Sequence, residues 1–139
     1  MRLYLTISLV LTLVHTALAD TTNRAKQFSP VPGIFVGGVG LECKSNPPNI
    51  VEFLLLTKDR QRVGLAVFEN DDVTYDFLAI TKTTPRTYIA EQENTEVVLD
   101  RQSLKLTMEQ DYKCVVMSIS DLHNAAKDFL RTLLSENKI

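Results

Sequence analysis

Between residues 50 and 118 the chain is a succession of short apolar runs separated by residues that favour turns. Within residues 103–109 apolar and polar side chains alternate, which is the pattern of a strand with one face toward water. Many short strands with short connections predict an all-β fold, an antiparallel meander rolled into a small barrel or folded as a sandwich. The expected strands are residues 50–57, 63–69, 73–82, 87–91, 95–100, 103–109 and 112–118.

A glycine-rich stretch, GIFVGGVG at residues 33–40, precedes these runs. It fits neither a dinucleotide-binding fingerprint, whose third glycine would fall on Cys43, nor a Walker loop, which requires Lys-Ser/Thr after a glycine. We therefore interpret it as the beginning of a first strand, which brings the total to about seven or eight. Phe35, Val39, Leu41 and Cys43 would share one face, and the glycines would permit a bulge, a sharp bend or close approach of the helix or arm.

The chain ends in a different pattern, DLHNAAKDFLRTLLSE at residues 121–136. Its apolar residues recur at helical spacing, which predicts an amphipathic helix docked on the sheet or covering a barrel mouth, with Ser120 as its N-cap. Residues 33–139 would thus form a single β domain with a C-terminal helix. The apolar stripe consists of Leu122, Ala126, Phe129, Leu130 and Leu133.

Residues 1–19 have the three-part layout of a cleavable secretory signal peptide. Arg2 is followed by an apolar run and then by Ala17-Leu18-Ala19, small residues that suit a cleavage site. The run is short for a membrane span, which takes ~20 residues, so no transmembrane segment is expected. Residues 20–32 are polar and contain two prolines, and they predict a flexible or extended N-terminal arm. The mature protein is expected to be secreted or periplasmic.

The mature chain contains two cysteines, Cys43 and Cys114. In an oxidising compartment they predict one disulfide that ties the first strand to the last; two buried free thiols are the alternative. Without Arg2 the formal charge changes from −2 to −3. A chain with this charge lacks the excess of basic residues that nucleic-acid binding requires.

The mature chain has one histidine, His123, so a metal site or catalytic dyad built from two histidines is not expected. His123 lies off the apolar stripe of the expected helix, so we interpret it as a surface residue near the helix start. Ser118, Ser120 and Asp121 are close in sequence, yet sequence neighbours rarely face one another as a catalytic triad. We expect no catalytic residues, no cofactor and no enzymatic activity.

Acidic residues gather at two expected turns, and each group suggests a weak candidate site. The first could bind Ca²⁺, although it lacks EF-hand spacing, and a pair of carboxylates from these two groups could serve glycoside hydrolysis. Solvated turns are the simpler interpretation of both. The calcium candidates are Glu69, Asp71, Asp72 and Asp76; the second group is Glu91, Glu93, Glu96 and Asp100.

Lys58, Arg60 and Arg62 make a small basic tip that could pair with a partner's acidic patch or with anionic lipid, or simply be solvated. Aromatic residues in the expected strands either fill the core or line a ligand cavity. The chain has no tryptophan and so lacks the Gly-x-Trp start of lipocalin-type carriers. The cavity candidates are Phe53, Phe68, Tyr75, Phe77, Tyr88 and Tyr112.

These observations favour an exported, non-enzymatic binding module, an extracellular or envelope accessory or inhibitor-type protein. It would act through its surface loops on an unidentified protein partner. The alternative is a carrier of a small apolar ligand, held in a barrel cavity capped by the C-terminal helix.

Overall fold

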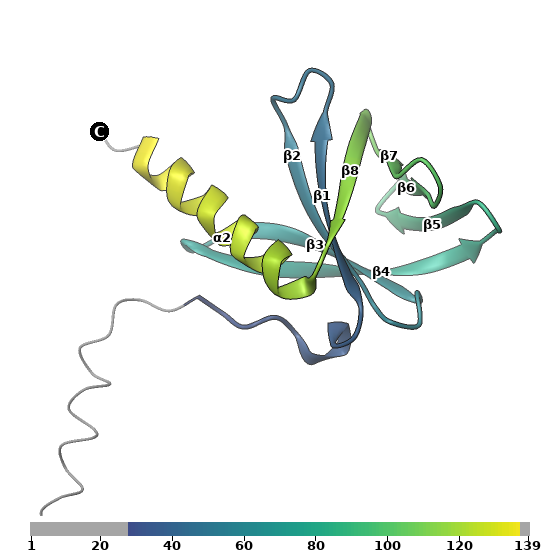
Figure 1. Cartoon of the computed structure of the whole chain (residues 1–139), viewed down its shortest axis with the longest axis horizontal. Coiled ribbons are helices and arrows are strands. Elements are labelled where there is room, and N and C mark those ends of the chain that lie inside the picture. Colours follow the sequence, from purple (N-terminus) through teal and green to yellow (C-terminus); the bar gives the residue numbers. More distant parts are fainter. Residues whose placement is uncertain (1–27, 137–139) are drawn as a thin grey trace, which may run out of the picture.

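The structure of the protein, a computed structural model, describes residues 28–136 of the chain. A short 3-10 helix precedes eight strands and one long helix (Figure 1). The predicted signal peptide at 1–19 and residues 20–27 of the predicted arm lie outside the described residues. The elements are η2 Gly33–Phe35, β1 Val39–Ser45, β2 Val51–Leu56, β3 Arg62–Glu69, β4 Asp72–Thr83, β5 Thr87–Gln92, β6 Thr95–Asp100, β7 Lys105–Thr107, β8 Asp111–Met117 and α2 Ile119–Glu136.

The strands form a closed antiparallel barrel in which each strand pairs with the next. The barrel closes because β1 also pairs with β8, along a register that runs from Gly40 opposite Met117 to Ser45 opposite Tyr112. The predicted all-β meander with one C-terminal helix is confirmed, and the barrel is the correct form. β7 is shorter than predicted, because Leu104 has a left-handed backbone (φ 59°) and the amide of Met108 closes a turn onto the carbonyl of Gln110.

Alternate residues of the strands point inward and fill the barrel with apolar side chains. Cys43 and Cys114 face each other across the β1–β8 seam and are joined by a disulfide inside the barrel. The predicted bond is therefore confirmed, and it links the first and last strands where the barrel closes. The buried interior residues are Leu41, Cys43, Leu54, Leu56, Val63, Leu65, Leu78, Ala90, Val97, Leu99, Leu106, Tyr112 and Cys114.

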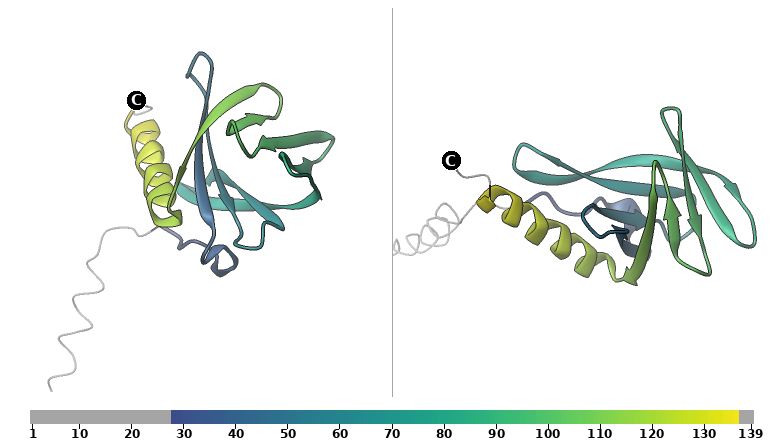
Figure 2. Two further views of the ribbon diagram at one scale, coloured as in Figure 1. Left: turned by 45° about the vertical axis from the view of Figure 1, so that its right-hand side comes forward. Right: turned by 90° about the horizontal axis from the view of Figure 1, so that it is seen from above.

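A second apolar core lies outside the barrel, under α2. Figures 1 and 2 show α2 leaving the end of β8 and running along the outer side of the barrel, over the β3–β4 hairpin. Leu122, Ala126 and Leu130 of its predicted stripe are buried there against the outward residues Phe53 and Leu55 of β2. Within residues 28–136 no helix is long and apolar enough to cross a membrane.

The helix begins two residues earlier than predicted, and its N-cap differs. The hydroxyl of Ser118 accepts a hydrogen bond from the amide of Asp121 (3.0 Å), so Ser118 and not Ser120 caps the helix. Residues 28–32 of the predicted arm are packed on the second core through Phe28 and Val31. The ring of Phe28 also lies beneath the guanidinium of Arg131, with 5.0 Å between Cζ and the ring centroid.

The glycine-rich stretch is only partly strand. Residues 33–35 form η2, Gly37 turns the chain with a φ of 82°, and β1 starts at Val39. The prediction that Phe35 shares a face with Leu41 and Cys43 is therefore wrong: Phe35 belongs to the outer core. The predicted close approach of the helix is confirmed, since a Cβ on Gly40 would collide with the side chain of Leu122.

Candidate functional site

A surface groove of about 770 Å³ lies where the turn between β2 and β3 meets η2. We call it the basal groove. Its lining combines one aliphatic side chain with charged and polar groups, so it offers both apolar contact and electrostatic recognition. The lining residues are Ile34, Thr57, Lys58, Asp59, Gln61 and Arg62.

The turn that forms one wall of the basal groove is held by the buried hydroxyl of Thr57. This hydroxyl donates to a carboxylate oxygen of Asp59 (2.8 Å) and accepts from the backbone amides of Gln61 and Arg62, both at 3.1 Å. Hydrogen bonds from the Thr57 hydroxyl and the Gln61 amide lower the pKa of Asp59. The Asp59 carboxylate is thus committed to the turn, which presents its basic neighbours in a defined arrangement.

The basic tip predicted from the sequence lies on this turn. Within residues 28–136, none of Lys58, Arg60 and Arg62 forms an ion pair with a carboxylate. Arg60 adopts a left-handed backbone (φ 58°) and donates through Nη1 to the carbonyl of Thr57 (2.8 Å). The tip therefore carries cationic groups that form no ion pair within the described residues, and Arg62 acts on the neighbouring Asp59 carboxylate electrostatically, lowering its pKa.

Apolar side chains stand exposed beside these charges. Ile34 is 42% exposed, Val36 78% and Phe77 49%. Between Ile34 and Val36, the side chain of Phe35 is fully buried over Gly64, where an added Cβ would lie 2.6 Å from Phe35 Cζ. Because Phe35 anchors η2 from below, its two neighbours are directed outward. Exposed aliphatic side chains grouped in this way characterise surfaces that bind other molecules.

Phe77 extends the same surface along the outside of the barrel. Its ring meets that of Phe35 edge to face, with 5.5 Å between centroids. Phe77 lies opposite Gly64 in the β3–β4 ladder, and Arg62 lies opposite Ala79 two residues further on. Side chains two apart on a strand share a face, so Phe77 and Arg62 project on the same side of the sheet.

The six aromatic cavity candidates occupy three different environments. Tyr112 is buried in the barrel and Tyr88 packs against that core. Phe53, Phe68 and Tyr75 lie in the outer core, and Phe77 is on the surface. The structure does not gather them around one cavity. The barrel interior retains a cavity of about 10 Å³, which is room for about one water molecule.

The four calcium candidates lie around the β3–β4 hairpin. Asp72 accepts hydrogen bonds from the amide of Ser29 (3.0 Å) and from the Ser29 hydroxyl, so it holds the arm. In the β3–β4 register Glu69 lies opposite Asp72 at the end of the ladder, and Asp76 lies opposite Leu65. Asp71 lies in the turn with a φ of 61°. Among residues 28–136, no three His, Cys, Asp or Glu side chains are grouped so that they could hold a metal ion.

The second acidic group is distributed along the β5–β6 hairpin. Glu91 lies opposite Glu96, and Glu93 is in the turn with a φ of 55°. Asp100, at the other end of the hairpin, forms an ion pair with Arg86 (2.8 Å). Asp100 is thus engaged in a structural contact rather than facing a second carboxylate across a cleft.

The prediction that His123 is a surface residue is wrong, because His123 is only 7% exposed. Its Nε2 lies 3.0 Å from the carbonyl oxygen of Ser29, and its Nδ1 lies 2.8 Å from the Tyr75 hydroxyl. A carbonyl only accepts, so Nε2 carries the proton and Nδ1 accepts from Tyr75. Burial lowers the pKa of His123 and raises that of Tyr75. The spacing of His123, Ala126 and Leu130 was the signal for this burial, since i, i+3 and i+7 share a helix face.

The chain matches no protein-family model, and no curated protein or solved structure was found to match it.

Proposed function

We propose that the protein is an exported, non-enzymatic binding module whose basal groove takes up an acidic, partly apolar segment of a partner protein. One observation carries the proposal: the exposed side chain of Ile34 lines the basal groove beside Lys58 and Arg62, which form no ion pair within the described residues, and the exposed Val36 follows two positions later. Apolar contact would supply affinity, and charge complementarity would supply orientation and a fast encounter.

The scaffold suits recognition by preformed surface groups. The Thr57 hydroxyl fixes one wall of the groove, and the buried ring of Phe35 fixes the other. A surface that is ordered before binding loses little conformational entropy when the partner arrives. An acidic segment carrying aliphatic or aromatic side chains would match both kinds of group in the groove.

The carrier alternative receives less support. A ligand in the centre of the barrel would need a cavity of hundreds of Å³, whereas the interior retains about 10 Å³. An enzymatic role also receives less support, because both ring nitrogens of His123 are engaged with Ser29 and Tyr75. Export is supported by the signal-peptide pattern and by the Cys43–Cys114 disulfide, a bond that persists in oxidising compartments.

The proposal is tested by affinity capture from the native extracellular or periplasmic fraction with three matched baits. These are the parent protein, the charge-reversed groove variant Lys58→Glu/Arg62→Glu, and the control variant Lys82→Glu/Lys113→Glu, whose lysines are exposed on β4 and β8. We expect a partner that the parent and control retain and the groove variant loses. A partner retained equally by all three baits would contradict the assignment of the groove.

A further inference from the structure

A second pocket, of about 200 Å³, opens at the end of the barrel that carries the β2–β3 and β6–β7 turns. We call it the mouth pocket. Its walls are apolar side chains from several strands, among them Leu41, Leu56 and Leu99, which are all buried. The small interior cavity lies behind it and shares Leu56, Tyr88 and Leu99. The mouth pocket is therefore a shallow apolar site above a filled barrel.

Two arginines are among the residues that line this pocket, Arg60 and Arg101. Arg60 is held through Nη1 by the carbonyl of Thr57, and Arg101 donates through Nη1 to the carbonyl of Thr84 (3.0 Å). The guanidinium of Arg101 also stacks over the ring of Tyr88, with 4.5 Å between Cζ and the centroid. Nη1 of Arg60 also donates to the carbonyl of Lys58 (3.5 Å). Nη1 of each guanidinium is thereby fixed, and Nε and Nη2 of both make no hydrogen bond to residues 28–136.

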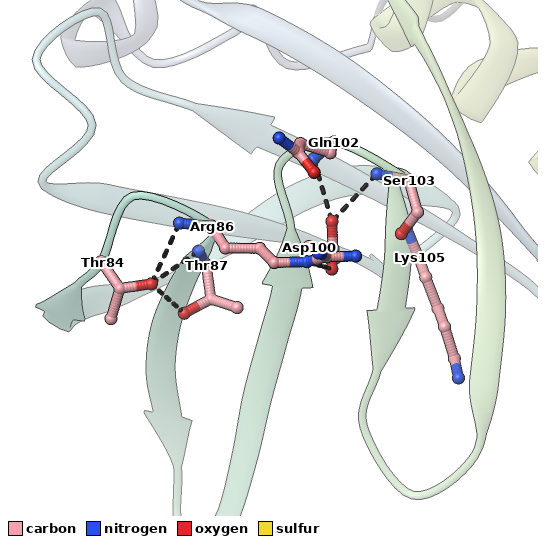
Figure 3. Close-up of polar contacts among 7 residues, drawn as sticks. All are labelled: Thr84, Arg86, Thr87, Asp100, Gln102, Ser103 and Lys105. Carbon is pink, nitrogen blue, oxygen red and sulfur yellow. Dashed lines mark hydrogen bonds and ion pairs between the residues drawn. The ribbon is translucent and has the colours of Figure 1, made fainter.

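The neighbouring carboxylates are committed elsewhere and do not neutralise these two cations. Asp100 pairs with Arg86 and accepts from the amides of Gln102 and Ser103, both at 2.9 Å (Figure 3). Asp59 is bonded inside its own turn. Neither Arg60 nor Arg101 forms an ion pair within the described residues. Two ordered guanidinium groups with unpaired charge therefore flank an apolar pocket.

We propose that the mouth pocket binds a small single-chain carboxylate, with its aliphatic tail between the strands and its head on Arg60 and Arg101. Guanidinium groups bind carboxylates through paired, charge-assisted hydrogen bonds. A volume of about 200 Å³, against about 10 Å³ in the barrel interior, leaves room for a short aliphatic tail. An eight-carbon fatty acid meets both conditions. This site goes beyond the proposed function, since its walls are not those of the basal groove.

The test is a titration of the purified, oxidised full-length mature protein with sodium octanoate below its micelle-forming concentration, followed by NMR. We expect saturable shifts of the Arg60 and Arg101 Nε–H signals and of the Leu99 amide. The neutral analogue 1-octanol should bind at least about tenfold more weakly, because it forgoes the charge-assisted bonds. Octylamine, with the opposite charge, should bind more weakly still. Equal affinity for octanoate and octylamine, or no saturable binding of octanoate, would overturn the proposal.

Variants locate the site. Arg60→Gln/Arg101→Gln should weaken octanoate binding at least about tenfold, whereas Arg62→Gln, which changes the basal groove, should leave it unchanged. Val116→Glu places a carboxylate at a pocket residue that is 48% exposed and should abolish binding without disturbing the core. If Val116→Glu and the double variant both bind octanoate like the parent, the ligand occupies another site. Because Arg62→Gln affects only the groove, failure of this proposal and failure of the partner proposal are distinguishable.

Discussion

The imidazole of His123 donates from Nε2 to the carbonyl oxygen of Ser29 over 3.0 Å, and so joins α2 to an arm residue 94 positions earlier in the chain. The arm, the β3–β4 hairpin and the helix meet at this contact, because Asp72 binds Ser29 and Tyr75 binds the other ring nitrogen. The buried imidazole thus joins three segments of the chain, and its lowered pKa favours the neutral form.

Acidification should loosen this contact. Burial holds the folded-state pKa of His123 below its ordinary value near 6.5, with Lys127 lowering it further and the Ser29 contact and Asp72 opposing the shift. The unfolded chain therefore binds the proton more readily, and this contribution to stability is present above about pH 6.5 and is lost as the pH falls toward the folded pKa. Urea unfolding at pH 7.5 and 5.0 measures the loss of unfolding free energy on acidification, and His123→Gln should make that loss smaller. An identical pH dependence in parent and variant would contradict the neutral assignment.

Removal of the Tyr75 hydroxyl should cost about 0.5–1.5 kcal/mol, the net value of a typical hydrogen bond. The Tyr75→Phe variant leaves Nδ1 of His123 without its partner but keeps the ring in the outer core. Its free energy of unfolding at pH 7.5 gives the cost. A variant as stable as the parent would show that the Tyr75 contact contributes nothing.

Valine at Gly40 should destabilise the protein by about 1–3 kcal/mol or more, since a side chain there is forced into Leu122. Gly38→Val should behave similarly, because its Cβ would collide with the carbonyl oxygen of Leu56. Gly33→Ala is the matched control, as an added Cβ at Gly33 meets nothing within 4 Å. Thermal unfolding of the three variants decides the point. If Gly40→Val and Gly33→Ala have the same melting temperature, the helix does not approach β1 as described.

Glu52 should show the opposite pH behaviour to His123. It lines a pocket of about 200 Å³ at the other end of the barrel, and burial raises its pKa. Its favourable contribution to folding stability is present below its unfolded-state pKa near 4.5. This contribution is lost as the pH rises through the raised folded-state pKa. Glu52→Gln should therefore stabilise the protein at pH 7 more than at pH 4. Equal effects of Glu52→Gln at both pH values would refute this account.

Loss of the disulfide should lower stability by at most ~4 kcal/mol, the chain-entropy value for a loop of this length. Cys43 and Cys114 are 71 residues apart in the chain, so the bond lowers the conformational entropy of the unfolded chain. The two residues also lie on paired strands, whose backbone hydrogen bonds specify the β1–β8 register without it. Unfolding of the oxidised protein is compared with that of Cys43→Ala/Cys114→Ala. Equal stability of the two forms would contradict the prediction.

The barrel could be predicted from local sequence patterns. Alternating apolar residues give strands their inward faces, and Asn70-Asp71, both with positive φ, form the tight turn expected between β3 and β4. The bounds of β6 were predictable because its turn residues adjoin it in the chain, and the disulfide was predictable because the mature chain has two cysteines and the sequence carries an export-signal pattern.

The candidate sites depend on contacts between distant segments, and no local pattern indicates these. Ser29 reaches Asp72 across 43 residues, and the basal groove forms only because η2 packs beside the β2–β3 turn. The basic tip was visible in the sequence as Lys58, Arg60 and Arg62, but its division between the groove and the mouth pocket was not. Phe35 illustrates the limit, because period-two alternation assigned it to a strand that begins only at Val39.

The basal groove is tested most directly by the affinity of the parent protein for a peptide of alternating Glu and Leu residues, against a peptide in which Lys replaces every Glu. Binding to the Glu peptide should be saturable and weakened by salt, since exposed charges are screened. Lys58→Glu/Arg62→Glu should lose at least about tenfold in affinity, and Lys82→Glu/Lys113→Glu should match the parent. Equal binding of both peptides, or equal binding by the groove and control variants, would contradict the account.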